Sequence, residues 1–168
     1  GTDQFRVGPG RLVGSGKATA KSVLTVALVF FALAAIAGLA ITIRTQQWWF
    51  LAVGAVAIVA AWFYTGGKRP YGYNALGEVF VFIFFGVVAV AGSAYLQTDT
   101  LSPVALAASI PVGLLVTNIL VINNLRDINT DRAAGKRTLA VRIGARATRA
   151  QYALFTVIAY AVPFILFF

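Results

Sequence analysis

The chain has 168 residues, of which 60% are hydrophobic and only 11% are charged, and its formal net charge is +9. Because an average soluble domain carries about 25% charged residues, this composition excludes an ordinary water-soluble globule and indicates an integral membrane protein. Cys and His are both absent, which removes disulfides, thiolate nucleophiles and imidazole chemistry. Any reaction must therefore use carboxylates, amines, guanidinium groups, amides or hydroxyls.

Five apolar segments follow a polar leader at 1–21. They have 17 to 22 residues each and cover 22–43, 48–64, 75–96, 104–122 and 150–168. Each falls in the window of roughly 17–25 residues that a transmembrane helix needs. We predict an all-α, polytopic transmembrane helix bundle in a single membrane domain. It has four helices within 22–122, a polar cytoplasmic loop at 123–149 and a fifth helix at 150–168. Because the sequence has no Met and ends inside an apolar segment, we expect an internal piece of a longer protein.

The basic residues lie almost entirely on one side of this predicted bundle, with Arg44 alone on the other side. The basic side holds Arg6, Arg11, Lys17, Lys21, Lys68, Arg69, Arg126, Arg132, Lys136, Arg137, Arg142, Arg146 and Arg149. Cytoplasmic loops carry the Lys and Arg excess, so we predict that these segments face the cytoplasm at the plasma membrane. Orientation and attraction to anionic lipids explain such a face in many proteins. The alternative is a polyphosphate site, which the acidic residues embedded in the basic segments favour.

Asp127 and Asp131 are the acidic pair with a chemically suggestive spacing. Four residues apart on a helix that continues the fourth apolar segment, they would be neighbours, with Asn123 one turn before them. Carboxylate and amide oxygens suit Mg²⁺, which binds one or two carboxylates together with substrate phosphates. Asp3 could supply another carboxylate from the leader. The alternative is that Asp127 pairs with Arg126 or Arg132 in a solvated loop.

The basic candidates for a phosphate site are Arg6 and Arg11, which flank a Gly-Pro-Gly turn, and Lys68, four residues after Tyr64. Arg offers bidentate contacts to phosphate oxygens and Lys offers a point charge. Each could equally be a determinant of topology. Glu78 is interpreted as an acid favoured near the positive end of the third predicted helix, with Asn74 as its cap.

Two stretches resemble the Asp-rich motifs of the UbiA-type membrane prenyltransferases. The run NNLRDINTDRAAGKRT at 123–138 resembles the second motif, and 1–16 resembles the end of the first, with Asp3 as its last carboxylate. Within the family, the Asn-Asn-x-Arg-Asp form is most similar to the branch that prenylates 1,4-dihydroxy-2-naphthoate in menaquinone synthesis. The resemblance covers the whole chain and implies a nine-span helical bundle around a central cavity, with five of the spans here. The earlier part of the first motif would precede Gly1, so we expect an incomplete active site, inactive alone.

The resemblance implies a Mg²⁺-dependent transfer of a polyprenyl group from polyprenyl diphosphate to 1,4-dihydroxy-2-naphthoate, with loss of CO₂ and diphosphate. It implies metal ligation by Asp3, Asp127 and Asp131, diphosphate binding by Arg6, Arg11, Lys68 and Asn123, and catalytic roles for Tyr64 and Lys68. Tyr64 would lie near the reacting allylic carbon. The implied partners are polyprenyl diphosphate, a small aromatic acid and membrane lipid, and no nucleic acid.

Two alternatives remain at this point. The first is another UbiA-type enzyme acting on 4-hydroxybenzoate, homogentisate or haem. The second, from a different class, is a transporter or channel module whose basic mouth recruits an anion. A transporter should carry polar groups and broken helices at mid-membrane. The centres of the predicted spans are almost purely apolar, which favours the enzyme.

Overall fold

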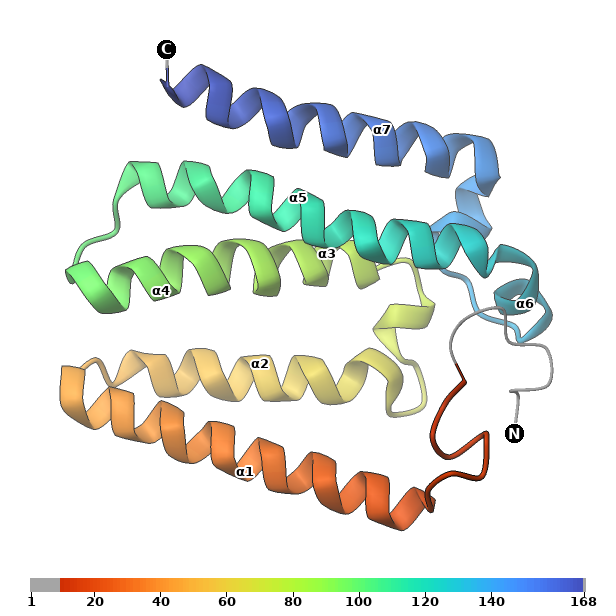
Figure 1. Ribbon diagram of the computed structural model, residues 1–168, viewed down its shortest axis with the longest axis horizontal. Helices are drawn as coiled ribbons and strands as arrows, with labels where there is room; N and C mark the ends of the chain where they lie inside the picture. The colour runs from red at the N-terminus through yellow and green to blue at the C-terminus, as the bar shows by residue number, and fades with distance from the viewer. Residues whose placement is uncertain (1–9, 168) are drawn as a thin grey trace. The chain divides into compact units, whose positions relative to one another are not determined.

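The computed structural model describes residues 10–167, which form helices joined by short turns (Figure 1). The chain divides into two compact units, the first ending at Val59 and the second beginning at Ala60. Within the described residues there is no β-strand, and the predicted all-α class is confirmed.

The first unit holds α1 (Ala20–Thr45) and the first part of α2 (Trp49–Thr65). Thr19 caps α1, since its Oγ1 accepts a hydrogen bond from the backbone amide of Ser22 at 3.1 Å. Thr42 is the buried residue of α1, and the rest of this apolar helix is largely exposed. A long helix that is apolar all round and not covered by protein suits a lipid environment.

The third predicted span is a helix of three segments that belongs to the second unit. These segments are α3 (Gly77–Val81), the π-helix η3 (Phe82–Val88) and α4 (Ala89–Thr98). A short 3₁₀ turn, η2 (Tyr71–Tyr73), precedes them. Wider π turns inside α-helices are rare and frequently occur close to functional sites.

The central helix of the second unit is α5 (Pro103–Arg126), which packs against η3 and its flanking helices as well as against α7 (Leu139–Phe167) (Figure 1). Its closest approach to η3 is at two glycines, where a Cβ on Gly86 would lie 2.5 Å from the Cα of Gly113. Small residues allow membrane helices to bring their backbones together in this way. The core of this unit therefore depends on the absence of side chains at these two positions.

Within residues 10–167, four helices are long and apolar enough to cross a membrane: Ala20–Thr45, Gly77–Thr98, Pro103–Arg126 and Leu139–Leu166. A shorter apolar helix, α2, has 17 residues. Four of these helices match predicted apolar segments to within four residues at either end, and α7 contains most of the fifth but begins eleven residues before it. The protein is therefore a multi-pass helical membrane protein.

The region predicted as a polar loop at 123–149 is mostly helical instead. α5 continues to Arg126, a short helix α6 (Ile128–Ala133) follows, and α7 already begins at Leu139. Polar side chains do not prevent a helix, and between α6 and α7 the chain is non-helical only from Ala134 to Thr138. Gly135 and Gly144 take positive φ values of 73° and 81°, which glycine adopts without steric cost. Hydrophobicity located the membrane spans but could not show that helices continue beyond them.

Candidate active site

Tyr64, near the end of α2, is held between two glycines of the following segment. A Cβ on Gly72 would lie 3.0 Å from Cε2 of the Tyr64 ring, and a Cβ on Gly77 would lie 3.6 Å from its hydroxyl oxygen. Both glycines are buried, and a side chain at Gly72 would collide with Tyr64, whereas the contact of Tyr64 with Gly77 is of ordinary van der Waals length. The Tyr64 hydroxyl is thereby fixed at the first turn of α3.

Tyr71 ties this segment to α2 and to the third span. Its hydroxyl donates a hydrogen bond to the carbonyl of Ala60 at 2.7 Å, and its ring stacks on Phe80 with centroids 4.2 Å apart. The Tyr64 ring meets it edge-on at 5.5 Å. Burial raises the pKa of the Tyr71 hydroxyl above its ordinary value.

We expect Tyr71→Phe to lower the free energy of unfolding by about 0.5–1.5 kcal/mol, because the Ala60 carbonyl loses its hydroxyl partner. The raised pKa means that the neutral hydroxyl stabilises the fold below the unfolded value of about 10, and that this contribution is lost as pH rises through the higher folded value. Thermal unfolding of the detergent-solubilised protein should therefore show a difference between wild type and variant that shrinks above about pH 10. A difference that stays constant through that range would contradict this assignment.

Glu78 is a buried carboxylate in the first turn of α3, with 6% of its surface exposed. Its Oε1 accepts a hydrogen bond from Nδ2 of Asn124, on α5, at 2.9 Å. The prediction that Asn74 caps this helix is wrong. The residue before α3 is Leu76, and the Asn74 side-chain amide donates to the carbonyl of Pro70 at 2.8 Å. Ala75, with a φ of 63°, turns the chain between Asn74 and the helix.

The Asp-rich run keeps helical spacing although α5 ends inside it. The backbone amide of Asp127 donates to the carbonyl of Asn123 at 3.0 Å, and the amide of Asp131 donates to the carbonyl of Asp127 at 2.8 Å. Asp127 itself takes φ −95° and ψ 8°, which separates α5 from α6. The three residues therefore remain one turn apart from each other across the break.

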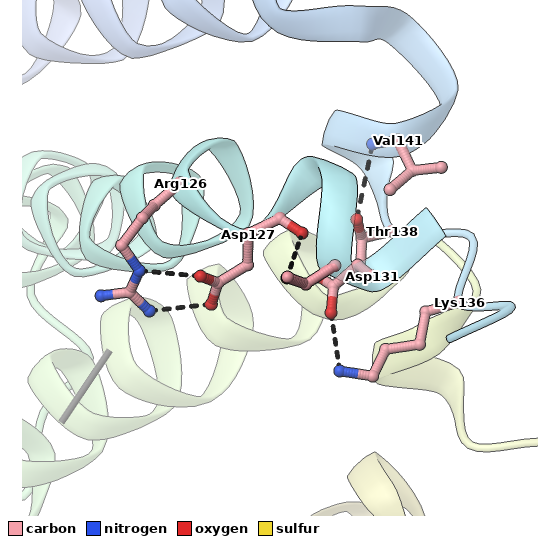
Figure 2. Close-up of polar contacts among 7 residues, drawn as sticks. Arg126, Asp127, Asp131, Lys136, Thr138 and Val141 are labelled. Atoms are coloured by element: carbon pink, nitrogen blue, oxygen red, sulfur yellow. Dashed lines mark hydrogen bonds and ion pairs between the residues drawn. The ribbon is translucent and has the colours of Figure 1, made fainter. Parts of the chain in front are cut away.

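Each carboxylate of the pair faces its own cation, as Figure 2 shows. Arg126 makes two hydrogen bonds of 2.8 Å to the Asp127 carboxylate, and Lys136 Nζ lies 2.7 Å from Oδ1 of Asp131. The Asp127 side chain is 26% exposed and that of Asp131 only 10%. Neither carboxylate is turned out into bulk water, and the Arg126 partner is the one that the ion-pair alternative named.

The Asp-rich run and the Tyr64 segment meet at one end of the second unit. Lys136 Nζ lies 4.9 Å from the centre of the Tyr73 ring, and the Arg137 amide donates to the Tyr73 carbonyl at 2.8 Å. One guanidinium nitrogen of Arg142 lies 3.4 Å from the Asn74 carbonyl. Segments separated by about sixty residues thus place Tyr64, Glu78, Asn124 and the Asp pair at a common end of the helices.

An open groove of about 370 Å³ between α5 and α7 adjoins this end. It is lined by Leu115, Asn118, Ile119, Ile122, Asn123, Tyr152, Thr156 and Tyr160. Asn123 is both a groove residue and the first member of the Asp-rich run. The polar end of the second unit therefore adjoins a groove of mixed polar and apolar lining between two membrane helices.

The remaining predicted site residues are Asp3, Arg6, Arg11 and Lys68. Asp3 and Arg6 lie outside the described residues. Arg11 is exposed in the turn before α1, in the first unit, and Lys68 is exposed in the turn after α2. Among residues 10–167 no group of three or more Asp, Glu, His or Cys side chains converges on a metal position. Of the three carboxylates predicted as metal ligands, Asp127 and Asp131 are the two that lie within the described residues.

Sequence reasoning did not give Glu78 a functional role. The signal available was a single acid at the start of an apolar segment, which the helix dipole already explains. Its burial depends on Asn124, a contact across 46 residues that no local pattern reveals.

Comparison with known proteins agrees with the resemblance of the motifs. The model of the UbiA prenyltransferase family matches residues 3–168. The 1,4-dihydroxy-2-naphthoate octaprenyltransferase of Mycobacterium tuberculosis is 50% identical over 99% of this chain and 56% of its own length. The enzyme of the same name from Escherichia coli is 44% identical over 83% of this chain and 47% of its own length.

A third relative is named for a different substrate. The 2-carboxy-1,4-naphthoquinone phytyltransferase of Synechocystis is 36% identical over 70% of this chain and 38% of its own length. No solved structure matches the chain significantly. The chain spans about half the length of the curated relatives it matches. The family match over nearly all its residues shows that the chain belongs to the UbiA prenyltransferase family.

Proposed function

We propose that the whole protein transfers a polyprenyl group from polyprenyl diphosphate to 1,4-dihydroxy-2-naphthoate, releasing CO₂ and diphosphate and forming the demethylmenaquinone skeleton. The observation that carries the proposal is the pair of carboxylates at Asp127 and Asp131. Lys136, the ion-pair partner of Asp131, lies over the ring of Tyr73, in the segment that packs against Tyr64. Relatives of up to 50% identity are named for a naphthoate transfer of this kind.

The donors of the Asp-rich run fit Mg²⁺. They are two carboxylates and one amide at successive helical turns, and hard oxygen ligands of this type suit that ion. Asp127 and Asp131 would hold one ion with help from Asn123, and Asp3 would hold a second. When bound, the metal neutralises charge that develops on the leaving diphosphate.

The cationic and aromatic residues complete the proposed site. Arg6, Arg11 and Lys68 would bind the diphosphate oxygens, with Asn123 beside them. Breaking the carbon–oxygen bond leaves an allylic cation, which the face of an aromatic ring stabilises. Tyr64 is the candidate for that role, because its ring packs closely against Gly72 and meets Tyr71 edge-on at the polar end of the helices.

The groove between α5 and α7 supports a place for the isoprenoid tail. Its lining is mainly apolar, it is open on one side, and Asn123 lies at its polar end. A diphosphate held at the Asp-rich run could therefore extend its hydrocarbon chain between the helices and into lipid. The basic residues at this end favour a cytoplasmic active site in the plasma membrane.

The transfer can be tested directly with the whole protein. Incubation with labelled polyprenyl diphosphate, Mg²⁺ and a panel of aromatic acids should give a lipophilic labelled product with 1,4-dihydroxy-2-naphthoate. 4-Hydroxybenzoate and homogentisate should give at most a few per cent of that rate. Faster prenylation of either of these acids would replace the proposed acceptor with another of the family.

Metal removal gives a separate expectation. Excess EDTA should stop prenyl transfer by the whole protein, and added Mg²⁺ should restore it, because the diphosphate then regains its counter-charge. The rate of diphosphate release is the measurement. A rate that is indifferent to EDTA would contradict metal-assisted ionisation and favour the anion-transport alternative.

A further inference from the structure

Glu78 is a buried acid that the proposed diphosphate and metal chemistry does not use. It is 6% exposed, at the start of a membrane helix, and its hydrogen-bond donor is the neutral amide of Asn124 at 2.9 Å. The ion pairs of the described region involve Asp127 and Asp131 instead. A carboxylate that is desolvated without a cation is costly, and ionisable groups retained in such places usually serve a function.

Glu78 lies close to two parts of the proposed active site, Tyr64 and the Asp-rich run. Gly77 directly precedes Glu78 in the sequence, and a Cβ on Gly77 would lie 3.6 Å from the Tyr64 hydroxyl oxygen. Asn124, which holds the carboxylate, follows Asn123 directly in the Asp-rich run. Glu78 therefore lies beside the proposed allylic site and next to the proposed diphosphate site.

The alternative role for the Glu78 carboxylate is to bind the metal as a third ligand beside Asp127 and Asp131. Within residues 10–167, however, Glu78 does not join Asp127 and Asp131 in a group of three possible metal ligands. Its Oε1 accepts a hydrogen bond from the Asn124 amide, and the carboxylate keeps lone pairs with which it can accept a further hydrogen bond. The geometry is better suited to accepting a proton from a bound hydroxyl group.

Building on the proposed prenyl transfer, we propose that Glu78 is the catalytic residue that accepts, and later returns, the proton of the aromatic substrate's ring hydroxyl. As the allylic carbon–oxygen bond breaks, its electron pair leaves with the diphosphate. A ring π pair forms the new carbon–carbon bond at the carbon that bears the carboxylate, and the neighbouring hydroxyl becomes a carbonyl as its proton passes to Glu78. The carbon–carboxylate bond then breaks and CO₂ leaves. Its electron pair restores the ring double bond, and the resulting enolate oxygen takes the proton back from Glu78.

This step explains why the carboxylate is held by a neutral amide. A cation paired with Glu78 would compete with the substrate hydroxyl for the carboxylate oxygens, whereas Asn124 orients the carboxylate through a single hydrogen bond. The proton is borrowed rather than consumed, so no route to bulk water is needed, in keeping with the burial of the side chain.

The test compares Glu78→Gln with wild type in the whole protein, using labelled polyprenyl diphosphate, Mg²⁺ and 1,4-dihydroxy-2-naphthoate. We expect kcat for prenyl transfer to fall by on the order of 10²–10⁴-fold. The KM for polyprenyl diphosphate and the slow Mg²⁺-dependent release of diphosphate without acceptor should stay within about twofold of wild type. The matched control is Asp99→Asn at the other end of the same helix, which should leave all three quantities unchanged.

Two further variants keep the proposal testable if the glutamine variant does not fold. Glu78→Asp retains a carboxylate and should keep a measurable part of kcat. Glu78→Ala leaves space for a small acid, so added formate should raise its kcat at least several-fold. Wild-type kcat in Glu78→Ala without formate, or a loss of kcat in Glu78→Asp as large as that in Glu78→Ala with no response to formate, would overturn the base assignment.

Other outcomes separate this proposal from the proposed function. Loss of diphosphate release in Glu78→Gln, in proportion to prenyl transfer, would assign Glu78 to the metal site instead. Wild-type prenylation of a different phenolic acid would replace only the proposed acceptor, and Glu78→Gln would then be measured on that phenol. A wild-type protein that releases diphosphate but prenylates no phenol would overturn both.

Discussion

Replacing either aspartate of the Asp-rich run with asparagine is expected to lower kcat for prenyl transfer by at least on the order of 10²–10³-fold. Asp127→Asn and Asp131→Asn keep the size of each side chain but remove the negative charge that would attract Mg²⁺. The backbone bonds that keep these residues one turn apart do not involve the side chains, so the helical path is retained. Turnover of labelled polyprenyl diphosphate by the whole protein is the measurement.

Loss of activity in these variants should not reflect unfolding. Arg126 and Asp127 are 34% and 26% exposed, and a pair with this much solvent contact contributes little to stability. Asp131 is only 10% exposed, but asparagine keeps an oxygen there that can accept the hydrogen bond of Lys136. Membrane expression and the thermal transition in detergent should therefore stay close to wild type. Asn129→Ala, at an exposed position of the same short helix, is the matched control and should keep its activity.

The two aspartates can be ranked against each other. Asp131 is the more deeply buried of the two, so its replacement should have the larger effect on the amount of Mg²⁺ needed for half-maximal rate. Near-wild-type kcat and Mg²⁺ dependence in either variant would remove that residue from the metal site.

The membrane spans could be predicted from sequence because hydrophobic length is a local property. The segments 22–43 and 48–64 differ from α1 and α2 by no more than two residues at either end. The start of α7 could not be found in this way, because Leu139 lies eleven residues before the predicted span at 150–168. Those eleven residues are polar enough to be taken for a loop, although their backbone is helical except at Gly144.

The Asp-rich ladder was likewise within reach of sequence reasoning, since spacing alone predicts Asn123, Asp127 and Asp131 at successive turns. The partners of these residues were not. Lys136 reaches Asp131 only because the chain turns back at Gly135, where φ is 73°. Glu78 and Asn124 meet through the packing of α3 on α5, which depends on the whole second unit rather than on any local pattern.

Gly86→Val is expected to destabilise the protein strongly, because η3 and α5 have no space between them at this point. A Cβ there would lie 2.5 Å from the Cα and 3.1 Å from the backbone nitrogen of Gly113, and backbone atoms cannot rotate aside as a side chain can. Overpacking of this kind costs typically about 1–3 kcal/mol and occasionally more. We expect a clearly lower thermal transition in detergent, with loss of prenyl transfer as the third span moves away from α5.

Gly38→Ala is the matched control for that substitution. It also places a Cβ on a glycine inside an apolar helix, but no atom lies within 4 Å of the new Cβ position. Because alanine favours the helix by about 0.5–1 kcal/mol over glycine, this variant should be as stable as wild type or slightly more so. If Gly86→Val melted at the same temperature as Gly38→Ala, the close approach of η3 and α5 could not be the contact that organises the second unit.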